Sequence, residues 1–67
     1  MIEVNGVPRD VPAGATVAEL LERLQLPPHG RGVAVAVDGE VVPRARWTQH
    51  ALPDGARVEV LAAMQGG

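Results

Sequence analysis

A single amphipathic helix limits what this chain can fold into, because that helix has to cover one layer of strands by itself. Thr16 is a good N-cap, and Glu19 stands three residues further on, which completes a capping box. Apolar residues at the spacings i, i+3, i+4 and i+7 form one stripe, and these are Val17, Leu20, Leu21 and Leu24. Pro27 and Pro28 are expected to stop the helix near Leu26.

Two short strands are expected before this helix. Residues 2–4 alternate between apolar and polar, as in a strand with one buried face. Asn5-Gly6 is a strong signal for a two-residue hairpin turn of type I′, so residues 7–11 form the return strand. Pro8 has no N–H to donate, which places that strand at an edge of the sheet.

Three further strands are expected after the helix. Residues 33–37 alternate valine and alanine, which puts the valines on one face and the alanines on the other. Asp38-Gly39 is a second hairpin signal, with residues 40–42 as a short return strand. Residues 44–52 are irregular or carry a short helical turn, and residues 57–61 form the last strand.

The order of two strands, one helix and three strands predicts an α+β fold, because one helix can cover only one face of a sheet. A hairpin, a crossover helix and a long last strand free to pair in parallel with the first describe a β-grasp, ubiquitin-like arrangement. Its mixed sheet would have about five strands, covered on one face by one main helix. Residues 1–63 make up this domain, and residues 64–67 follow as a flexible Gly-Gly tail.

Composition excludes several classes of function. Six arginines stand against eight acids without a run of either sign, whereas a nucleic-acid-binding domain has a basic face. Trp47 is the only aromatic residue, so there is no stacking platform for single strands. No apolar run approaches the roughly 18 residues of a membrane span. We expect a soluble, cytoplasmic chain that is a monomer when free and binds neither nucleic acid nor membrane.

The inventory of reactive side chains is short. The sequence contains no serine, cysteine, lysine or tyrosine, so the usual nucleophiles are missing and a self-sufficient enzyme is not expected. His50 and Asp54 suggest an oriented base, but a histidine that packs or caps a turn is the better interpretation, because it has nothing to activate. His29 is interpreted as a solvated loop residue, and two histidines without cysteine do not predict a metal site.

The reactive group that remains is the carboxylate at the end of the tail Met64, Gln65, Gly66 and Gly67. An ionised carboxylate is a poor electrophile until a partner activates it, most simply as an acyl-adenylate made from ATP. A sulfur nucleophile then leaves a thiocarboxylate, whereas an amine leaves an amide. Glycines fit both reactions, because a tether without side chains can thread a narrow channel. The alternative is an end that is merely frayed.

Two surface regions are candidate docking sites. If the valines of residues 33–37 face the helix, Ala34 and Ala36 line the uncovered face of the sheet, as a docking surface or as ordinary exposed residues. Arg44 and Arg46 flank Trp47, which is typical of a buried tryptophan beside two solvated arginines. The alternative is that both arginines pair with acidic groups of a partner.

Several short motifs follow one another along the chain: Asn5-Gly6, residues 16–21 and 35–44, Trp47 with His50, Leu52, Asp54-Gly55 and Gly66-Gly67. With these motifs the chain resembles the ThiS family over its whole length, within the MoaD/ThiS group of the β-grasp, ubiquitin-like superfamily. The segment from Val42 to His50 is its most specific part. Two departures fall in turns, Asp38 where asparagine is common and Ala56 where the family often has an acid.

The resemblance implies a sulfur carrier of thiamine biosynthesis, which is a co-substrate and not an enzyme. A ThiF-like adenylyltransferase, using ATP with magnesium, would adenylate Gly67, and the carrier itself would bind no cofactor. A cysteine desulfurase or persulfide donor would supply the sulfur of a thiocarboxylate. Thiazole synthase (ThiG) would take that sulfur into the thiazole moiety, with Gly66, Gln65 and Met64 threading the active sites of the partners.

Three alternatives share the fold and remain open at this point. The small subunit of molybdopterin synthase, or a carrier of another pathway, would insert the Gly-Gly end into a different acceptor enzyme. A ubiquitin-like modifier would be joined through Gly67 to lysines of other proteins. A plain interaction domain would have an inert tail.

Overall fold

The computed structural model describes residues 1–26 and 32–62, and within them the predicted order of elements is confirmed. The first strand is followed by its hairpin partner, the helix, a second hairpin, a short 3-10 helix and a long last strand. The elements are β1 (Ile2–Val4), β2 (Val7–Arg9), α1 (Val17–Arg23), β3 (Val33–Val37), β4 (Glu40–Val41), η1 (Arg44–Arg46) and β5 (Arg57–Ala62). Among these residues, no helix is long and apolar enough to cross a membrane.

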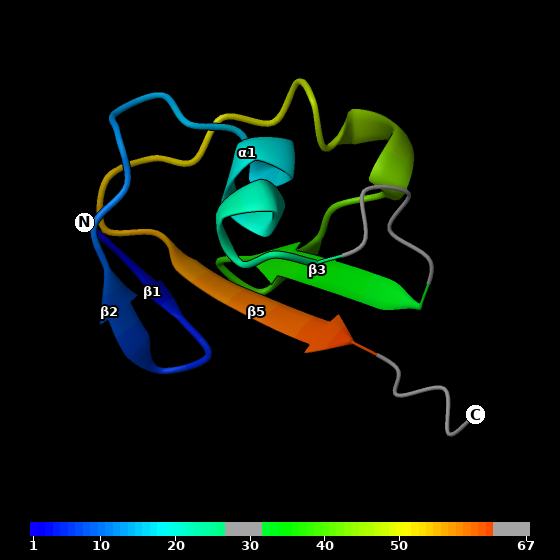
Figure 1. The fold of residues 1–67 in the computed structure, drawn as a ribbon, viewed down its shortest axis with the longest axis horizontal. Helices are drawn as coiled ribbons and strands as arrows, with labels where there is room; N and C mark the ends of the chain where they lie inside the picture. The colour runs from blue at the N-terminus through cyan, green and yellow to red at the C-terminus, as the bar shows by residue number, and fades with distance from the viewer. Residues whose placement is uncertain (27–31, 63–67) are drawn as a thin grey trace.

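The five strands form one mixed sheet in the order β2-β1-β5-β3-β4, and α1 lies across one face of it (Figure 1). β5 pairs in parallel with β1 and antiparallel with β3, so the last strand occupies the centre of the sheet. This is the predicted α+β, β-grasp arrangement. β2 is an edge strand, as Pro8 requires, but it ends at Arg9 and does not reach Val11. The reason is register: Arg9 lies opposite Ile2, the first residue of β1.

The helix begins where the sequence predicts. The Thr16 side chain accepts a hydrogen bond from the Glu19 backbone N–H at 3.2 Å. The Glu19 carboxylate accepts one from the Thr16 backbone N–H at 2.8 Å. These two bonds are the capping box, and they satisfy N–H groups that have no partner inside the helix.

The end of the helix differs from the prediction, because α1 stops at Arg23 and does not continue to Leu26. The Leu26 N–H donates to the Leu21 carbonyl at 3.1 Å, and the Gln25 N–H donates to the Glu22 carbonyl at 2.9 Å. This pair of bonds is a Schellman motif, with Gln25 in the left-handed region at φ 59°. The motif therefore ends the helix before Pro27 is reached, and Leu26 packs against the core.

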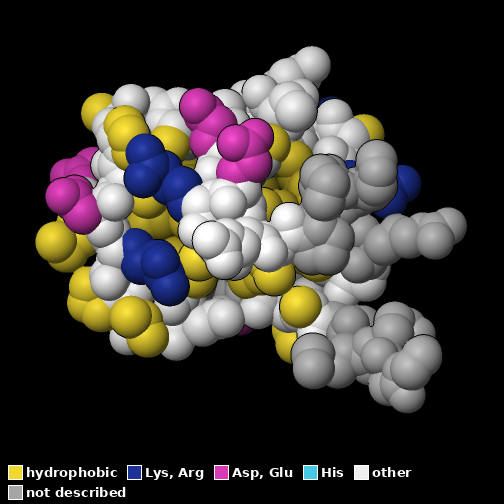
Figure 2. Space-filling view, in the orientation of Figure 1, with side chains coloured by type: hydrophobic (Ala, Val, Ile, Leu, Met, Phe, Trp, Pro, Cys, Tyr) yellow, Lys and Arg dark blue, Asp and Glu magenta, His cyan; other side chains and the backbone are white. Residues whose placement is uncertain are grey.

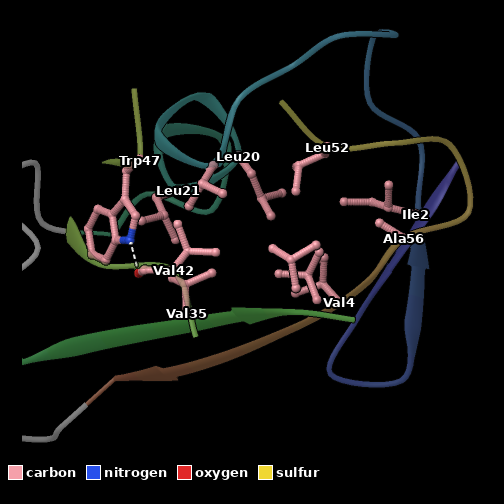
Figure 3. Packing of buried hydrophobic residues seen from close by; sticks show 12 residues of the cluster. Ile2, Val4, Leu20, Leu21, Val35, Val42, Trp47, Leu52 and Ala56 are labelled. Atoms are coloured by element: carbon pink, nitrogen blue, oxygen red, sulfur yellow. Dashed lines mark hydrogen bonds between the residues drawn. The ribbon is translucent and has the colours of Figure 1, made fainter. Parts of the chain in front are cut away.

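The hydrophobic core fills the space between α1 and the sheet. Leu20 and Leu21 point from α1 toward Val35 on β3 (Figure 3), and Leu20 has no exposed surface. Full burial of such a side chain contributes about 1.5–3 kcal/mol to the free energy of unfolding. Trp47 closes one side of the core, and its indole N–H donates to the Val42 carbonyl at 2.9 Å. Val35 and Val37 are both buried, so the predicted inward side of β3 is confirmed.

Candidate functional site

The candidate site is the end of β5, because the chain passes from there toward the C-terminal glycines. β5 is paired with β3 from Val58 to Ala62 and with β1 at Arg57 and Val58. The predicted site residues Met64, Gln65, Gly66 and Gly67 lie outside the described residues, as does the whole of 63–67. The structure therefore describes the chain as far as Ala62, the last residue of β5, and shows what holds that strand in place.

The turn between β1 and β2 holds β5 near its end. Asn5 and Gly6 have φ angles of 50° and 83°, as a type I′ turn requires. The Asn5 side-chain oxygen accepts from the Val60 N–H at 2.9 Å, and the Asn5 amide nitrogen donates to the Val60 carbonyl at 3.0 Å. We call these two bonds the Asn5 clamp. Asn5 also donates its backbone N–H to the Val58 carbonyl at 2.9 Å.

The turn between β3 and β4 holds the start of the same strand. Asp38 and Gly39 have φ angles of 51° and 83°, so the second predicted turn is confirmed. The Asp38 carboxylate accepts from the Arg57 N–H at 2.9 Å, and the Asp38 N–H donates to the Arg57 carbonyl at 2.7 Å. Sequence reasoning predicted both turns but missed that their side chains bind β5. The available signal was an Asx residue at the first position of each turn.

The uncovered face of the sheet carries the two alanines that were predicted there. Ala34 is exposed and lies opposite Leu61, while Ala36 is half-buried and lies between Glu59 and Val41. Val41 and Leu61 are 73% and 74% exposed, so this half of the face is mostly apolar and open to solvent, with the exposed Glu59 carboxylate beside Ala36. A docking role for it stays a prediction.

The other half of the uncovered face is charged. Arg57 lies opposite Glu3 across β5 and β1, with 3.5 Å between the Arg57 Nε and a carboxylate oxygen of Glu3. The Arg57 side chain is largely exposed and that of Glu3 is partly exposed, so this pair adds little to stability. The face is therefore divided, with charge toward β1 and apolar surface toward β3, β4 and the end of β5.

The second candidate docking region, around Trp47, lies beside α1. The Ala18 N–H donates to the Trp47 carbonyl and the Val17 N–H to the His50 carbonyl, both at 3.0 Å. Trp47 is buried as predicted, whereas Arg44 and Arg46 are exposed on η1. η1 lies on the side of the sheet that α1 covers (Figure 1), so these arginines do not share a surface with the alanines of β3.

The histidines and carboxylates do not form a catalytic pair in the part of the chain that is described. Asp54 accepts a hydrogen bond from the Met1 ammonium at 2.5 Å, and His50 is half-buried beside the start of α1. His29 lies outside the described residues. No group of three or more potential metal ligands occurs among residues 1–26 and 32–62. Figure 2 shows arginine and carboxylate side chains mixed on the face that it presents, with apolar surface between them.

Comparison with known proteins gives one consistent result. The model of the ThiS family matches residues 2–67. The sulfur carrier protein ThiS of Escherichia coli K12 is 42% identical over 55 residues, which cover 82% of this chain and 80% of that protein. The crystal structure of a thiamine biosynthesis protein (ThiS) from Geobacter metallireducens superimposes with a TM-score of 0.80 at 35% identity, covering 98% of this chain and 97% of that one.

A third relative is much longer than this chain. A thiazole synthase of Paramagnetospirillum magneticum is 38% identical over 64 residues, which cover 96% of this chain but only 19% of that protein. One stretch of that longer chain is therefore similar to nearly all of the domain described above.

Proposed function

The chain belongs to the ThiS family, and we infer from this that it is a sulfur carrier protein of thiamine biosynthesis and not itself an enzyme. The observation that carries this inference is the family match over residues 2–67, joined to a fold that agrees with a ThiS structure across almost the whole chain. The short inventory of nucleophiles is in keeping with a protein on which other enzymes act.

The group that we propose to carry sulfur is the carboxylate of Gly67. An adenylyltransferase would join this carboxylate to the α-phosphate of ATP, with magnesium on the phosphates and pyrophosphate as the leaving group. The outer sulfur of a persulfide would then attack the carbonyl carbon and displace AMP, which gives an acyl disulfide. A thiol would attack the donor's sulfur in that acyl disulfide, leaving the thiocarboxylate and a disulfide between the thiol and the donor. Gly66 lets the partner approach the carbonyl without obstruction, because glycine has no side chain.

Thiazole synthase is the acceptor that we propose for the sulfur. The support is the Paramagnetospirillum magneticum thiazole synthase, in which a stretch similar to this chain is part of the same polypeptide. A ThiF-like adenylyltransferase and a cysteine desulfurase or persulfide donor complete the proposed set of partners. Met64 and Gln65 would lie in the partners' channels together with the two glycines.

The apolar half of the uncovered face is the docking surface that we propose for the adenylyltransferase. Ala34 and Ala36 are small enough to admit a partner closely, and Leu61 extends the surface to within a few residues of the tail. Arg44 and Arg46, on the covered side, would contact a different part of a partner. The variants Ala34→Glu and Arg46→Glu test these two regions one at a time, because each variant changes the charge on one side of the sheet only.

The experiment is a reconstitution followed by intact-mass measurement. The chain is incubated with its adenylyltransferase, ATP, magnesium and a sulfur donor, and fragmentation then locates the change. We expect one carboxylate oxygen of Gly67 to be replaced by sulfur, and sulfur to leave again when thiazole synthase and its substrates are added. Absence of both the adenylate and the sulfur exchange would overturn the proposal.

Two controls make the result specific. A chain lacking Gly67 should keep the same unfolding curve, because the core is built from residues between Ile2 and Val60 and a terminal glycine has no side chain to bury, yet it should not be modified. Replacing thiazole synthase by the large subunit of molybdopterin synthase should leave the thiocarboxylate intact. Transfer to the latter enzyme alone would assign the carrier to the other pathway.

A further inference from the structure

We propose that Asn5 is a positioning residue for sulfur transfer, because it holds β5 at Val60, two residues before the strand ends at Ala62. The proposal rests on the proposed function, since it concerns how the tail is presented to the enzymes that modify it. Asn5 would act through the Asn5 clamp on Val60, seven residues before Gly67.

The clamp continues a strand pairing that the backbone cannot continue. β1 pairs with β5 only as far as Val4 opposite Val58, because the chain then turns back at Asn5-Gly6. On the other side, β3 continues to pair with β5 as far as Ala62. The Asn5 amide supplies one acceptor and one donor to Val60, which two further residues of β1 would supply in a continued parallel pairing. β5 is therefore held from both sides near its end, by Asn5 at Val60 and by the pairing with β3 that runs to Ala62, although β1 has already ended.

The chemistry of this position selects asparagine. The clamp needs a donor and an acceptor on one short side chain, and the side-chain amide offers both, whereas an ionised aspartate only accepts. The backbone at φ 50° is left-handed, which asparagine tolerates better than most residues. Asp38 stands in the corresponding turn at φ 51°, where its carboxylate accepts from the Arg57 N–H, and an acceptor without a donor is sufficient for that bond.

The consequence for the tail follows from chain length. Five residues follow Ala62, the last residue of β5, and they span at most roughly 18 Å, so the position of the end of β5 sets the volume that the Gly67 carboxylate can reach. Without the clamp, β5 is held beyond Val58 by β3 alone, and its end can fray from that side. An enzyme that threads the tail would then have to fix the end of β5 as well, at a cost in conformational entropy.

The test compares two matched variants, Asn5→Gly and Asp38→Gly. Both positions are left-handed, so glycine adds no backbone strain at either one and removes only the side-chain bonds to β5. Amide hydrogen exchange measured by NMR reports on Val60, Leu61 and Ala62 at one end and on Arg57 at the other. Steady-state adenylation with the adenylyltransferase gives kcat and KM for the carrier as the varied substrate.

We expect Asn5→Gly to speed amide exchange at the end of β5, because the two side-chain hydrogen bonds to Val60 are lost. The KM for the carrier should rise by about five- to tenfold with little change in kcat, because binding must then supply the order that these bonds provided. Asp38→Gly should affect exchange at Arg57 and leave KM near that of the unmodified chain. Asn5→Asp, which keeps the acceptor, should fall between them. Unchanged exchange at Val60, or the same rise in KM for both glycine variants at matched stability, would overturn the proposal.

The two proposals fail in different ways. If the unmodified chain is not adenylated at all, the proposed function fails, and a role of Asn5 in positioning for that reaction fails with it. If the unmodified chain is adenylated and Asn5→Gly has the same KM, only the role of Asn5 is overturned. Folding of each variant is checked by its NMR spectrum, and Asn5→Asp provides a second substitution at the same site.

Discussion

The two faces of the sheet have opposite characters although they alternate along the same strands. On β5, Val58 is completely buried beneath α1, whereas Leu61 is 74% exposed on the other side. On β3, Val35 belongs to the core and Ala34 faces solvent. The covered face contains the core that keeps this small domain folded, while the uncovered face is open to solvent and is the surface proposed above for docking. Substitutions on the covered face should therefore change the free energy of unfolding much more than substitutions on the uncovered face.

The largest difference should come from the same substitution on each side of the sheet. Leu20→Ala removes most of a fully buried side chain that α1 contributes to the core. The free energy of unfolding should fall by about 3 kcal/mol, because buried apolar surface is lost and a cavity is left behind. Leu61→Ala should change it by less than about 0.5 kcal/mol, because that side chain is exposed. Denaturant unfolding followed by circular dichroism measures both. Equal losses would show that the faces are not divided as described.

A substitution of Trp47, which closes one side of the core, tests how much its hydrogen bond contributes to stability. Trp47→Phe keeps most of the apolar surface but removes the N–H that satisfies the Val42 carbonyl in the core. We expect a loss of about 1–3 kcal/mol, since a buried acceptor is left without a donor. Circular dichroism is the suitable probe, because the only tryptophan is gone. An unchanged unfolding midpoint would mean that water or another donor reaches Val42.

Replacing Gln25, which follows α1 on the covered side of the sheet, should increase the stability of the domain. It occupies the left-handed position of the Schellman motif at φ 59° with an exposed side chain, and glycine adopts that conformation without strain. Gln25→Gly should raise the free energy of unfolding by about 0.5–1 kcal/mol. Gln49→Gly, at a second exposed glutamine without positive φ, is the matched control and should not stabilise. A loss at position 25 would contradict this account of the helix end.

The smallest effect should be the pH dependence of the ion pair between Met1 and Asp54. The hydrogen bond to Asp54 raises the pKa of the Met1 ammonium above its usual 8.0, and the same bond lowers the pKa of Asp54 below its usual 3.8. The ammonium contributes stability below pH 8.0 that is lost as the pH rises through its raised pKa. Asp54 contributes stability above pH 3.8 that is lost as the pH falls through its lowered pKa.

Stability due to this pair should therefore be flat between these two limits and fall on either side. Both groups are exposed, so the effect is modest and should shrink with added salt. Unfolding curves at several pH values, for the unmodified chain and for Asp54→Asn, measure the contribution by difference. A variant with the same pH profile as the unmodified chain would show that the pair does not couple to folding.

The elements of the fold could be predicted because their signals are local. A capping box, an apolar stripe at helical spacing and two Asx-Gly turns each act within a few residues, and their positions in the sequence were sufficient to locate α1 and both hairpins. The end of α1 was predicted too late, because Pro27 is visible in the sequence whereas the left-handed backbone of Gln25 is not. The start of the helix has a side-chain signature, and its end here depends on a backbone conformation.

Local patterns in the sequence were enough to predict the class of fold, the inward valines of β3, the edge position of Pro8 and the scarcity of nucleophiles. The folded chain was needed to find that Asn5 reaches Val60, that Asp38 reaches Arg57 and that Asp54 pairs with the Met1 ammonium. These partners are separated by 55, 19 and 53 positions in the chain, respectively. Local preferences fix turns and helices, but contacts at such separations exist only once the sheet has set its register.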